Sequence, residues 1–248
     1  MTTTAPAAGS TPAPKNLLAR FIGIVTAPRD TFQSIVATPR VLGMLVVVTL
    51  LVSVFAALPV MTPGGKQAAV DKAMEGVQAM KRLGINVDTD QAREQIEKSS
   101  SQMPVRNGVG VLVFAPIVTA ALAGLLFAIF NAGLGGEARF KQVFAVVVHA
   151  GVISTLQIGF SSVMNYARET IDFGTNLGML LPFLPEQSPV VAFFSAIDIF
   201  RLWWIVVLAI GLGVLYRRRT APIAYTLVGI YVLYAIGYAV YKSVSGGA

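Results

Sequence analysis

The feature that most constrains this chain is the apolar segment at residues 197–219, which reads IDIFRLWWIVVLAIGLGVLYRRR. Its centre, residues 202–215, carries no charged side chain, and Arg217, Arg218 and Arg219 follow it. A charged side chain at the centre of a bilayer costs about 3 kcal/mol, and basic residues concentrate where helices leave the membrane on the cytoplasmic side. The segment therefore predicts a transmembrane helix whose carboxyl end reaches the cytoplasm.

The composition of the whole chain supports the same class of protein. Hydrophobic residues make up 55% of the sequence, charged residues only 12%, and the mean hydropathy is +0.70, whereas soluble domains are about 25% charged. The net charge of +7 is also compatible with nucleic-acid binding. However, the basic side chains lie at the ends of apolar segments and form no patch interleaved with aromatic residues, so we expect no nucleic-acid partner.

Five apolar segments repeat this pattern, and each is long enough for the ~20 residues that a helix needs to cross the hydrocarbon core. The sequence therefore predicts an all-α polytopic membrane protein, in which residues 41–243 form a domain with five transmembrane helices. We expect a tight turn at residues 220–222, between the fourth and the fifth transmembrane helices. The five segments are residues 41–60, 108–134, 140–166, 197–216 and 223–241.

The amino-terminal region divides into two parts. Residues 1–14 consist mainly of Thr, Ala, Pro and Gly, and we expect a disordered tail because they bury too little apolar surface to offset the entropy of ordering. Residues 15–40 place apolar side chains at helical spacing and predict two short amphipathic helices. These helices either lie among the lipid headgroups or pack against the cytoplasmic face of the protein itself, and the sequence leaves both alternatives open.

Residues 62–107 form the only sizeable polar section, in which seven basic and six acidic side chains mix. Apolar residues at helical intervals predict a first helix that stops at Gly84. Asp88 is a suitable cap for a second helix that ends near Ser101. We expect a helical extramembrane loop, which is either a solvated hairpin or a module that binds a partner.

The third apolar segment is unusually polar, with His149 and Gln157 about two turns apart on one helix face. Polar side chains in a membrane must face protein or water, so we expect this helix inside the bundle. His149 is the sole histidine, and we expect it to be a hydrogen-bonded packing residue rather than a metal ligand. A metal site needs several ligands at suitable spacing, so we expect no metal and no cofactor.

Asp198 and Arg201 form the only acid–base pair close to an apolar segment. Counting back from Tyr216 places the pair in the outermost turns of its helix, where an arginine side chain can reach the headgroups. One interpretation is an interfacial anchor or a structural ion pair. The other is a site for a substrate or an ion, because a charge inside a membrane is a functional hypothesis by default.

The distribution of basic residues predicts the orientation. With the amino end in the cytoplasm, the inner segments hold nine basic residues against two acidic ones, Asp30 and Glu137, and the outer segments hold nine basic and nine acidic ones, most of them in the long polar loop. The total of basic residues is therefore a tie, but the shorter links differ, since three arginines lie between the fourth and fifth segments and Arg168 is alone between the third and fourth. Basic residues in short loops mark the cytoplasmic side, so we expect the amino end inside and the carboxyl end outside. The nine are Lys15, Arg20, Arg29, Arg40, Arg139, Lys141, Arg217, Arg218 and Arg219.

Three stretches resemble bacterial Yip1-domain proteins. They are LLARFIGIVTAPRDTFQSIVATPRVLG near the amino end, GLGGEARFKQVFAVVVHAG between the second and third segments, and IDIFRLWWIVVLAIGLGVLYRRRTAPIAY at the fourth. The resemblance covers about residues 17–241 and matches least in the polar loop. It implies five transmembrane helices, a cytoplasmic amino end in a bacterial inner membrane, and no known catalysis.

We therefore expect a non-enzymatic scaffold or adaptor, with the lipid bilayer and either a protein partner or a second copy of the chain as its partners. Paired carboxylates, a metal cluster and an activated nucleophile are all missing from the sequence. The alternative is a small transporter or channel subunit that uses the polar third segment and the Asp198/Arg201 pair. A water-filled cavity that reaches both His149 and Gln157 would favour transport, and a dry bundle would favour scaffolding.

An odd number of crossings predicts that the two ends of the chain lie on opposite sides of the membrane. Tags at the two ends should therefore be labelled from opposite sides of sealed vesicles by a reagent that cannot cross the bilayer. Labelling of both tags from one side would contradict five crossings.

Overall fold

The computed structural model describes residues 15–185 and 188–245. In this part of the chain, helices joined by short links are the regular structure, and one isolated β-bridge joins Asn176 and Asp198. The predicted disordered tail, residues 1–14, lies outside the described residues. The elements follow in the order α1 (Leu17–Thr26), α2 (Pro28–Ala37), α3 (Leu42–Ala57), η1 (Pro59–Met61), α4 (Pro63–Arg82), α5 (Thr89–Ser99), η2 (Ser100–Gln102), α6 (Met103–Phe127), η3 (Ala128–Gly133), α7 (Phe140–Ala167), η4 (Leu177–Leu180), α8 (Pro189–Ser195), α9 (Ile199–Leu215) and α10 (Thr220–Ser245).

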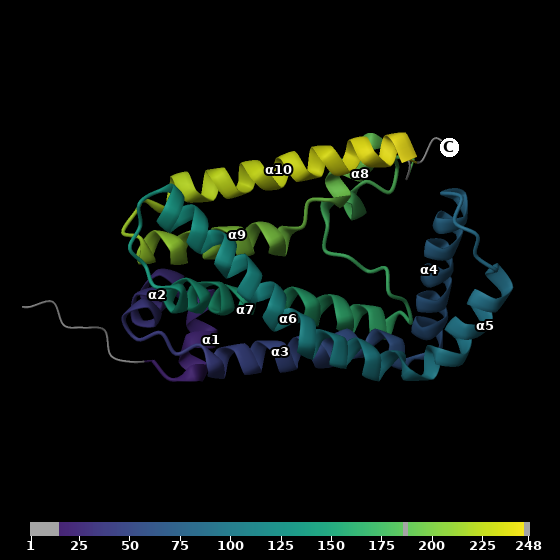
Figure 1. The fold of residues 1–248 in the computed structure, drawn as a ribbon, viewed down its shortest axis with the longest axis horizontal. Helices are drawn as coiled ribbons and strands as arrows, with labels where there is room; N and C mark the ends of the chain where they lie inside the picture. Colours follow the sequence, from purple (N-terminus) through teal and green to yellow (C-terminus); the bar gives the residue numbers. More distant parts are fainter. Residues whose placement is uncertain (1–14, 186–187, 246–248) are drawn as a thin grey trace, which may run out of the picture.

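Five helices, α3, α6, α7, α9 and α10, form a bundle along the long axis of the molecule, and their directions alternate (Figure 1). Each of them covers most of one of the five apolar segments. The helices α1 and α2 lie at one end of the bundle, and the α4–α5 hairpin stands at the other, with α4 running across the direction of the bundle (Figure 1).

The helices of the bundle differ in length. Within the described residues, three continuous helical stretches are long and apolar enough to cross a membrane, and they contain α6, α7 and α10. The other two apolar helices are shorter, with 16 residues in α3 and 17 in α9. At ~1.5 Å per residue these two are about 25 Å long, somewhat less than the ~30 Å hydrocarbon core.

The helix α7 lies at the centre of the bundle. In its most apolar window 56% of the residues are buried, against 11% in the corresponding windows of α6 and α10. The helices α3, α6 and α9 pack around it, and α1 and α2 cover its first turns. The prediction that the polar third segment lies inside the bundle is therefore confirmed.

The helix α2 is part of the core. Phe32 and Ile35 are fully buried against α7 and α9. The fit is close, because a Cβ atom at Gly211 of α9 would lie 3.0 Å from the ring of Phe32. On α1, by contrast, Leu18 and Ile22 are exposed. Of the two alternatives for residues 15–40, α2 therefore packs on the protein, whereas the contact of α1 with lipid headgroups stays a prediction.

The polar loop folds as the predicted helical hairpin. Gly84, with a φ of 81°, ends the first helix in a left-handed conformation that glycine adopts without strain. A side-chain oxygen of Asp88 accepts hydrogen bonds from the backbone N–H groups of Asp90 and Gln91, which caps α5 as expected. The hairpin meets the bundle through a small cluster in which Val60, Val70 and Met103 are buried.

The prediction of a turn at residues 220–222 was wrong, because Thr220 already begins α10. The chain reverses earlier, at Arg217, which has a φ of 51°. There the N–H groups of Arg218 and Arg217 donate to the carbonyl oxygens of Gly213 and Val214, a Schellman motif that ends α9. Pro222 does not break α10, because N–H groups in the first turn of a helix have no helical partner to lose.

Replacing Phe32 with Ala should lower the free energy of unfolding by about 3–5 kcal/mol, because it leaves a cavity between α2, α7 and α9. The measurement is thermal unfolding of the purified protein in detergent micelles. Phe114→Ala is the matched control, since this ring on α6 is 66% exposed, and its removal should leave the melting temperature nearly unchanged. Equal losses for the two variants would contradict the docking of α2.

Candidate functional site

Asp198 is the N-cap of α9. Its Oδ1 accepts a hydrogen bond of 3.0 Å from the backbone N–H of Arg201, and its Oδ2 accepts one from the Oγ1 hydroxyl of Thr175. Its own backbone N–H donates to Oη of Tyr231 at 2.9 Å. Both carboxylate oxygens of Asp198 are therefore occupied within the protein.

Thr175 and Tyr231 extend these contacts into a polar network across the bundle. The Nε2 group of Gln157, on α7, donates to Oγ1 of Thr175 at 3.3 Å. On α10, the Tyr231 hydroxyl donates to the carbonyl oxygen of Ala196 at 2.7 Å. The network thus joins α7, the segment before α8, the start of α9 and the middle of α10, and it links Gln157 to Asp198 through Thr175.

The expected ion pair between Asp198 and Arg201 is not among those formed in the described part of the chain. The Arg201 guanidinium instead lies 5.6 Å from the ring centroid of Trp204, a cation–π contact. The pair lies at the start of α9, and its predicted position at the membrane interface stays a prediction. Because α9 is shorter than α10, the first turn of α9 is level with Tyr231 near the middle of α10 (Figure 1).

His149 belongs to a different site from Gln157. Its side chain is fully buried, with Nδ1 2.7 Å from the carbonyl oxygen of Ala145, while Nε2 has no hydrogen-bond partner. His149 lines a cavity of about 250 Å³ at the end of the bundle that carries α1 and α2, together with Lys15, Arg20 and Arg40. We call it the basic cavity. Burial, with a contribution from the charge of Arg40, lowers the pKa of Arg20.

The three consecutive arginines lie at the same end of the bundle. An Nη2 group of Arg218 donates to the carbonyl oxygen of Leu134 at 2.9 Å. The neighbouring Tyr216 stacks on Phe130, with 4.8 Å between ring centroids, and donates to Oδ1 of Asn131 at 2.7 Å. These contacts hold the turn after α9 against the turn after α6. They indicate a structural role at a helix exit.

Sequence reasoning missed the residues that attach the hairpin to the bundle. Glu169, with a φ of 52°, follows the end of α7 in a second Schellman motif. Its carboxylate accepts a hydrogen bond of 3.1 Å from the N–H of Gly64 in the first turn of α4. Lys72 and Asp172 form an ion pair of 3.0 Å beside it. No local signal predicts these contacts, because each joins residues about 100 positions apart.

The described residues contain no group of three or more His, Asp or Glu side chains that could hold a metal ion. The absence of a cofactor stays a prediction. Chemically, the two sites differ: the network around Asp198 is internally satisfied, whereas the basic cavity holds buried polar atoms without partners.

The apolar helices, the buried polar central helix and the basic helix exits define the chain as a multi-pass membrane protein. A comparison with protein families assigns it more narrowly: the Yip1 domain family matches residues 22–241, and the chain belongs to this family. It is similar to the membrane protein YknW of Bacillus subtilis (strain 168), with 21% identity over 91% of this chain and 92% of that protein. No solved structure matches. Neither comparison names an enzyme.

Replacing Asp198 with Ala should lower the free energy of unfolding by about 2 kcal/mol, because it removes a helix cap and leaves the Thr175 hydroxyl without its acceptor. Asp198→Asn keeps a capping oxygen and should lose less than half of that. Arg201→Gln should stay within about 0.5 kcal/mol of the parent protein. Thermal unfolding in micelles measures all three. A loss with Arg201→Gln as large as that with Asp198→Ala would indicate that the two charges act as a pair.

Proposed function

We propose that this protein is a non-enzymatic membrane scaffold. It crosses the bilayer five times with its amino end in the cytoplasm, and it presents the α4–α5 hairpin to another protein on the outer side. The hairpin, which projects beyond the bundle and carries an exposed apolar tip, is the observation that carries this proposal (Figure 1).

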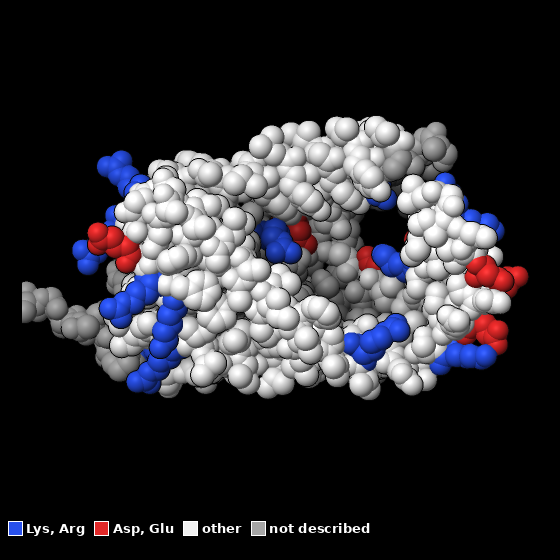
Figure 2. Space-filling model, in the orientation of Figure 1, with Lys and Arg blue, Asp and Glu red and all other residues white. Residues whose placement is uncertain are grey.

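The five crossings and the orientation rest on alternation and charge. The five apolar helices run in alternating directions, so α1 and α2 share one end with the turns at 134–139 and 216–219 (Figure 1). Figure 2 shows mostly Lys and Arg side chains at that end, and basic and acidic side chains mixed around the hairpin. This asymmetry is typical of a cytoplasmic end and an outer end. Local thinning of the bilayer, or flanking side chains that reach to the headgroups, accommodates the shorter α3 and α9.

The hairpin is a solvated module that ion pairs within it help to stabilise. No residue of α5 is buried, and its helix is stabilised by the ion pairs Arg93–Glu97 and Lys98–Glu94, each between residues four positions apart. At the tip, by contrast, apolar side chains are exposed: Leu83 by 81%, Ile85 by 50% and Met80 by 46%. Exposed apolar side chains that gather on a polar surface mark sites of protein association.

Transport is the second candidate, and one observation favours it. Arg201 lines a cavity of about 230 Å³ between α3, α6, α7 and α9, which also includes the hydroxyl side chains of Thr49, Thr119 and Ser154. This cavity includes neither His149 nor Gln157, and the basic cavity does not include Gln157. The polar residues of α7 therefore open into separate spaces, and the scaffold is the better supported function.

A photo-crosslinking amino acid at Leu83 should form a discrete adduct with a partner protein in intact membranes, identified by mass spectrometry. Phe183 is the matched control position, because it is exposed and apolar, lies in the segment between α7 and α8, and is not part of the hairpin. We expect no defined adduct there. An adduct of two copies of the chain would identify the partner as a second copy of this protein.

A second substitution at the tip of the hairpin tests the same contact. Ile85→Ser should weaken the adduct formed from Leu83 without changing the amount of protein in the membrane, because it removes an apolar side chain beside the contact. Equal crosslinking from Leu83 and Phe183, or an adduct that Ile85→Ser leaves unchanged, would refute the hairpin as the docking module.

A further inference from the structure

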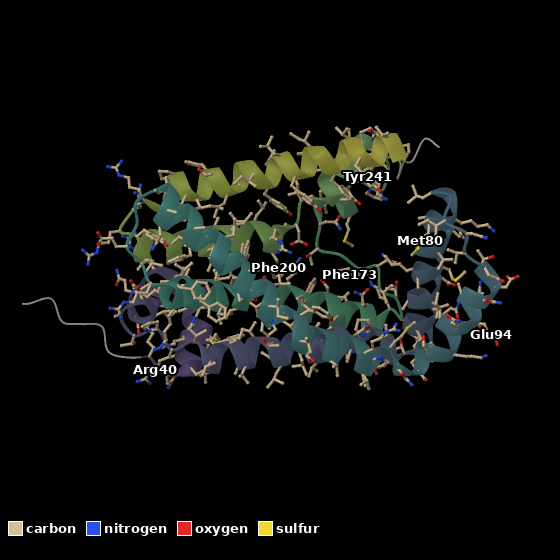
Figure 3. The ribbon with its side chains drawn as sticks, viewed as in Figure 1. Arg40, Met80, Glu94, Phe173, Phe200 and Tyr241 are labelled. Atoms are coloured by element: carbon tan, nitrogen blue, oxygen red, sulfur yellow. The ribbon has the colours of Figure 1, made fainter. Side chains whose placement is uncertain are left out.

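The basic cavity contains an accumulation of positive charge without a counter-charge. Residues from α1, from the link before α3, from the start of α3 and from α7 line it, and none of these lining residues carries a carboxylate. Figure 3 places Arg40 at this end, far from Met80 and Glu94 in the hairpin. The lining residues are Lys15, Asn16, Leu17, Arg20, Arg40, Gly43, Met44 and His149.

Arg20 supplies a buried donor without an acceptor. The residue is only 3% exposed, and its Nε–H donates to the carbonyl oxygen of Lys15 at 3.0 Å. Its Nη2 group has no hydrogen-bond partner. A charged donor that is buried and unsatisfied is strongly unfavourable, so such a group in a folded protein indicates a missing acceptor.

The start of α3 adds further donors. Gly43 and Met44 belong to its first turn and line the cavity, and no side chain caps this end of the helix. The free N–H groups of a first helical turn and the helix dipole both favour an anion. Together with Arg20, Arg40 and Lys15, they make this cavity a site for several anionic oxygens.

His149 specifies a second property of the ligand. Because its Nδ1 lies 2.7 Å from a carbonyl oxygen, which can only accept, Nδ1 carries the proton. In the neutral ring Nε2 is then an acceptor, and it is buried without a partner. A ligand that satisfies both Arg20 and His149 therefore presents anionic oxygens on one side and a hydroxyl group on the other.

We propose that the basic cavity binds a phosphate group that carries a hydroxyl donor. The phosphate oxygens accept from Arg20, Lys15, Arg40 and the first turn of α3, and the hydroxyl donates to Nε2 of His149. Two sources share this chemistry: a hydroxylated phospholipid headgroup such as that of phosphatidylglycerol, and free phosphate, whose P–OH group is the donor. The site lies at the opposite end of the molecule from the hairpin, so it stands or falls independently of partner docking.

The experiment uses the full-length protein in a non-ionic detergent and compares pairs of anionic ligands in which one member carries a hydroxyl group. Native mass spectrometry measures retention of phosphatidylglycerol against phosphatidylmethanol, which lacks the hydroxyl group, and titration calorimetry measures inorganic phosphate against sulfate. We expect at least tenfold tighter binding of the hydroxyl-bearing member of one pair, because the other leaves His149 unsatisfied. The pair that binds identifies the source, lipid or soluble phosphate.

Three variants separate this site from general attraction. Arg40→Gln should weaken binding about tenfold, because it removes one charged donor from an exposed position where folding tolerates the change. Arg29→Gln removes the same charge from an exposed position on α2 outside the cavity, and it should leave the affinity unchanged. His149→Phe should abolish the preference for the hydroxyl-bearing ligand. The melting temperature of Arg40→Gln should equal that of the parent protein, which shows that this variant is folded.

Binding of either ligand that depends on Arg40 and not on Arg29 supports the proposal. Absence of binding for all four ligands overturns it. Equal losses with Arg40→Gln and Arg29→Gln also overturn it, because they indicate a diffuse electrostatic attraction at this end of the molecule. Equal binding within each matched pair overturns the role of His149.

Discussion

The structure depends on the burial of α7, a helix that carries polar groups through the centre of an apolar bundle. Such a helix is stable only if its side chains find partners inside the protein. Thr155 donates to the carbonyl oxygen one turn earlier, at Gly151, and Gln157 contacts Thr175. Close packing completes the shield, since a Cβ atom at Gly159 would lie 2.9 Å from the ring of Phe55 on α3. The surrounding helices are therefore arranged to cover α7 and leave their own outer faces to lipid.

The two ends of the bundle have different chemistry. At the end with α1 and α2, basic side chains gather around a cavity that contains buried, unsatisfied polar atoms, which suits an anionic group. At the other end, the hairpin mixes charges of both signs and exposes apolar side chains at its tip, which suits another protein. The proposed phosphate site and the proposed docking module would together make the protein a scaffold that links a membrane surface to a partner.

Much of the fold was predictable because its signals are local. The five apolar segments, the capped hairpin and the buried third segment follow from hydropathy and spacing, and the family assignment agrees with the resemblance of three short stretches. The position of the turn between α9 and α10 was not predictable, because the sequence does not distinguish a proline in the first turn of a helix from one that ends a helix. The Asp198/Arg201 pair was misleading for a similar reason: three residues of spacing permit an ion pair, but the carboxylate caps its own helix instead.

The sequence by itself determined that this protein belongs in a membrane, which segments are helical and which end is basic. These properties follow from the composition of contiguous stretches, because the hydropathy of a segment decides whether it is more stable in lipid or in water, whatever the rest of the chain contains. Only the tertiary structure decided which polar groups meet: that His149 shares a cavity with Lys15, Arg20 and Arg40, and that Thr175 links Gln157 to Asp198. Such groupings depend on how helices far apart in the chain pack against α7, and no local pattern encodes that packing.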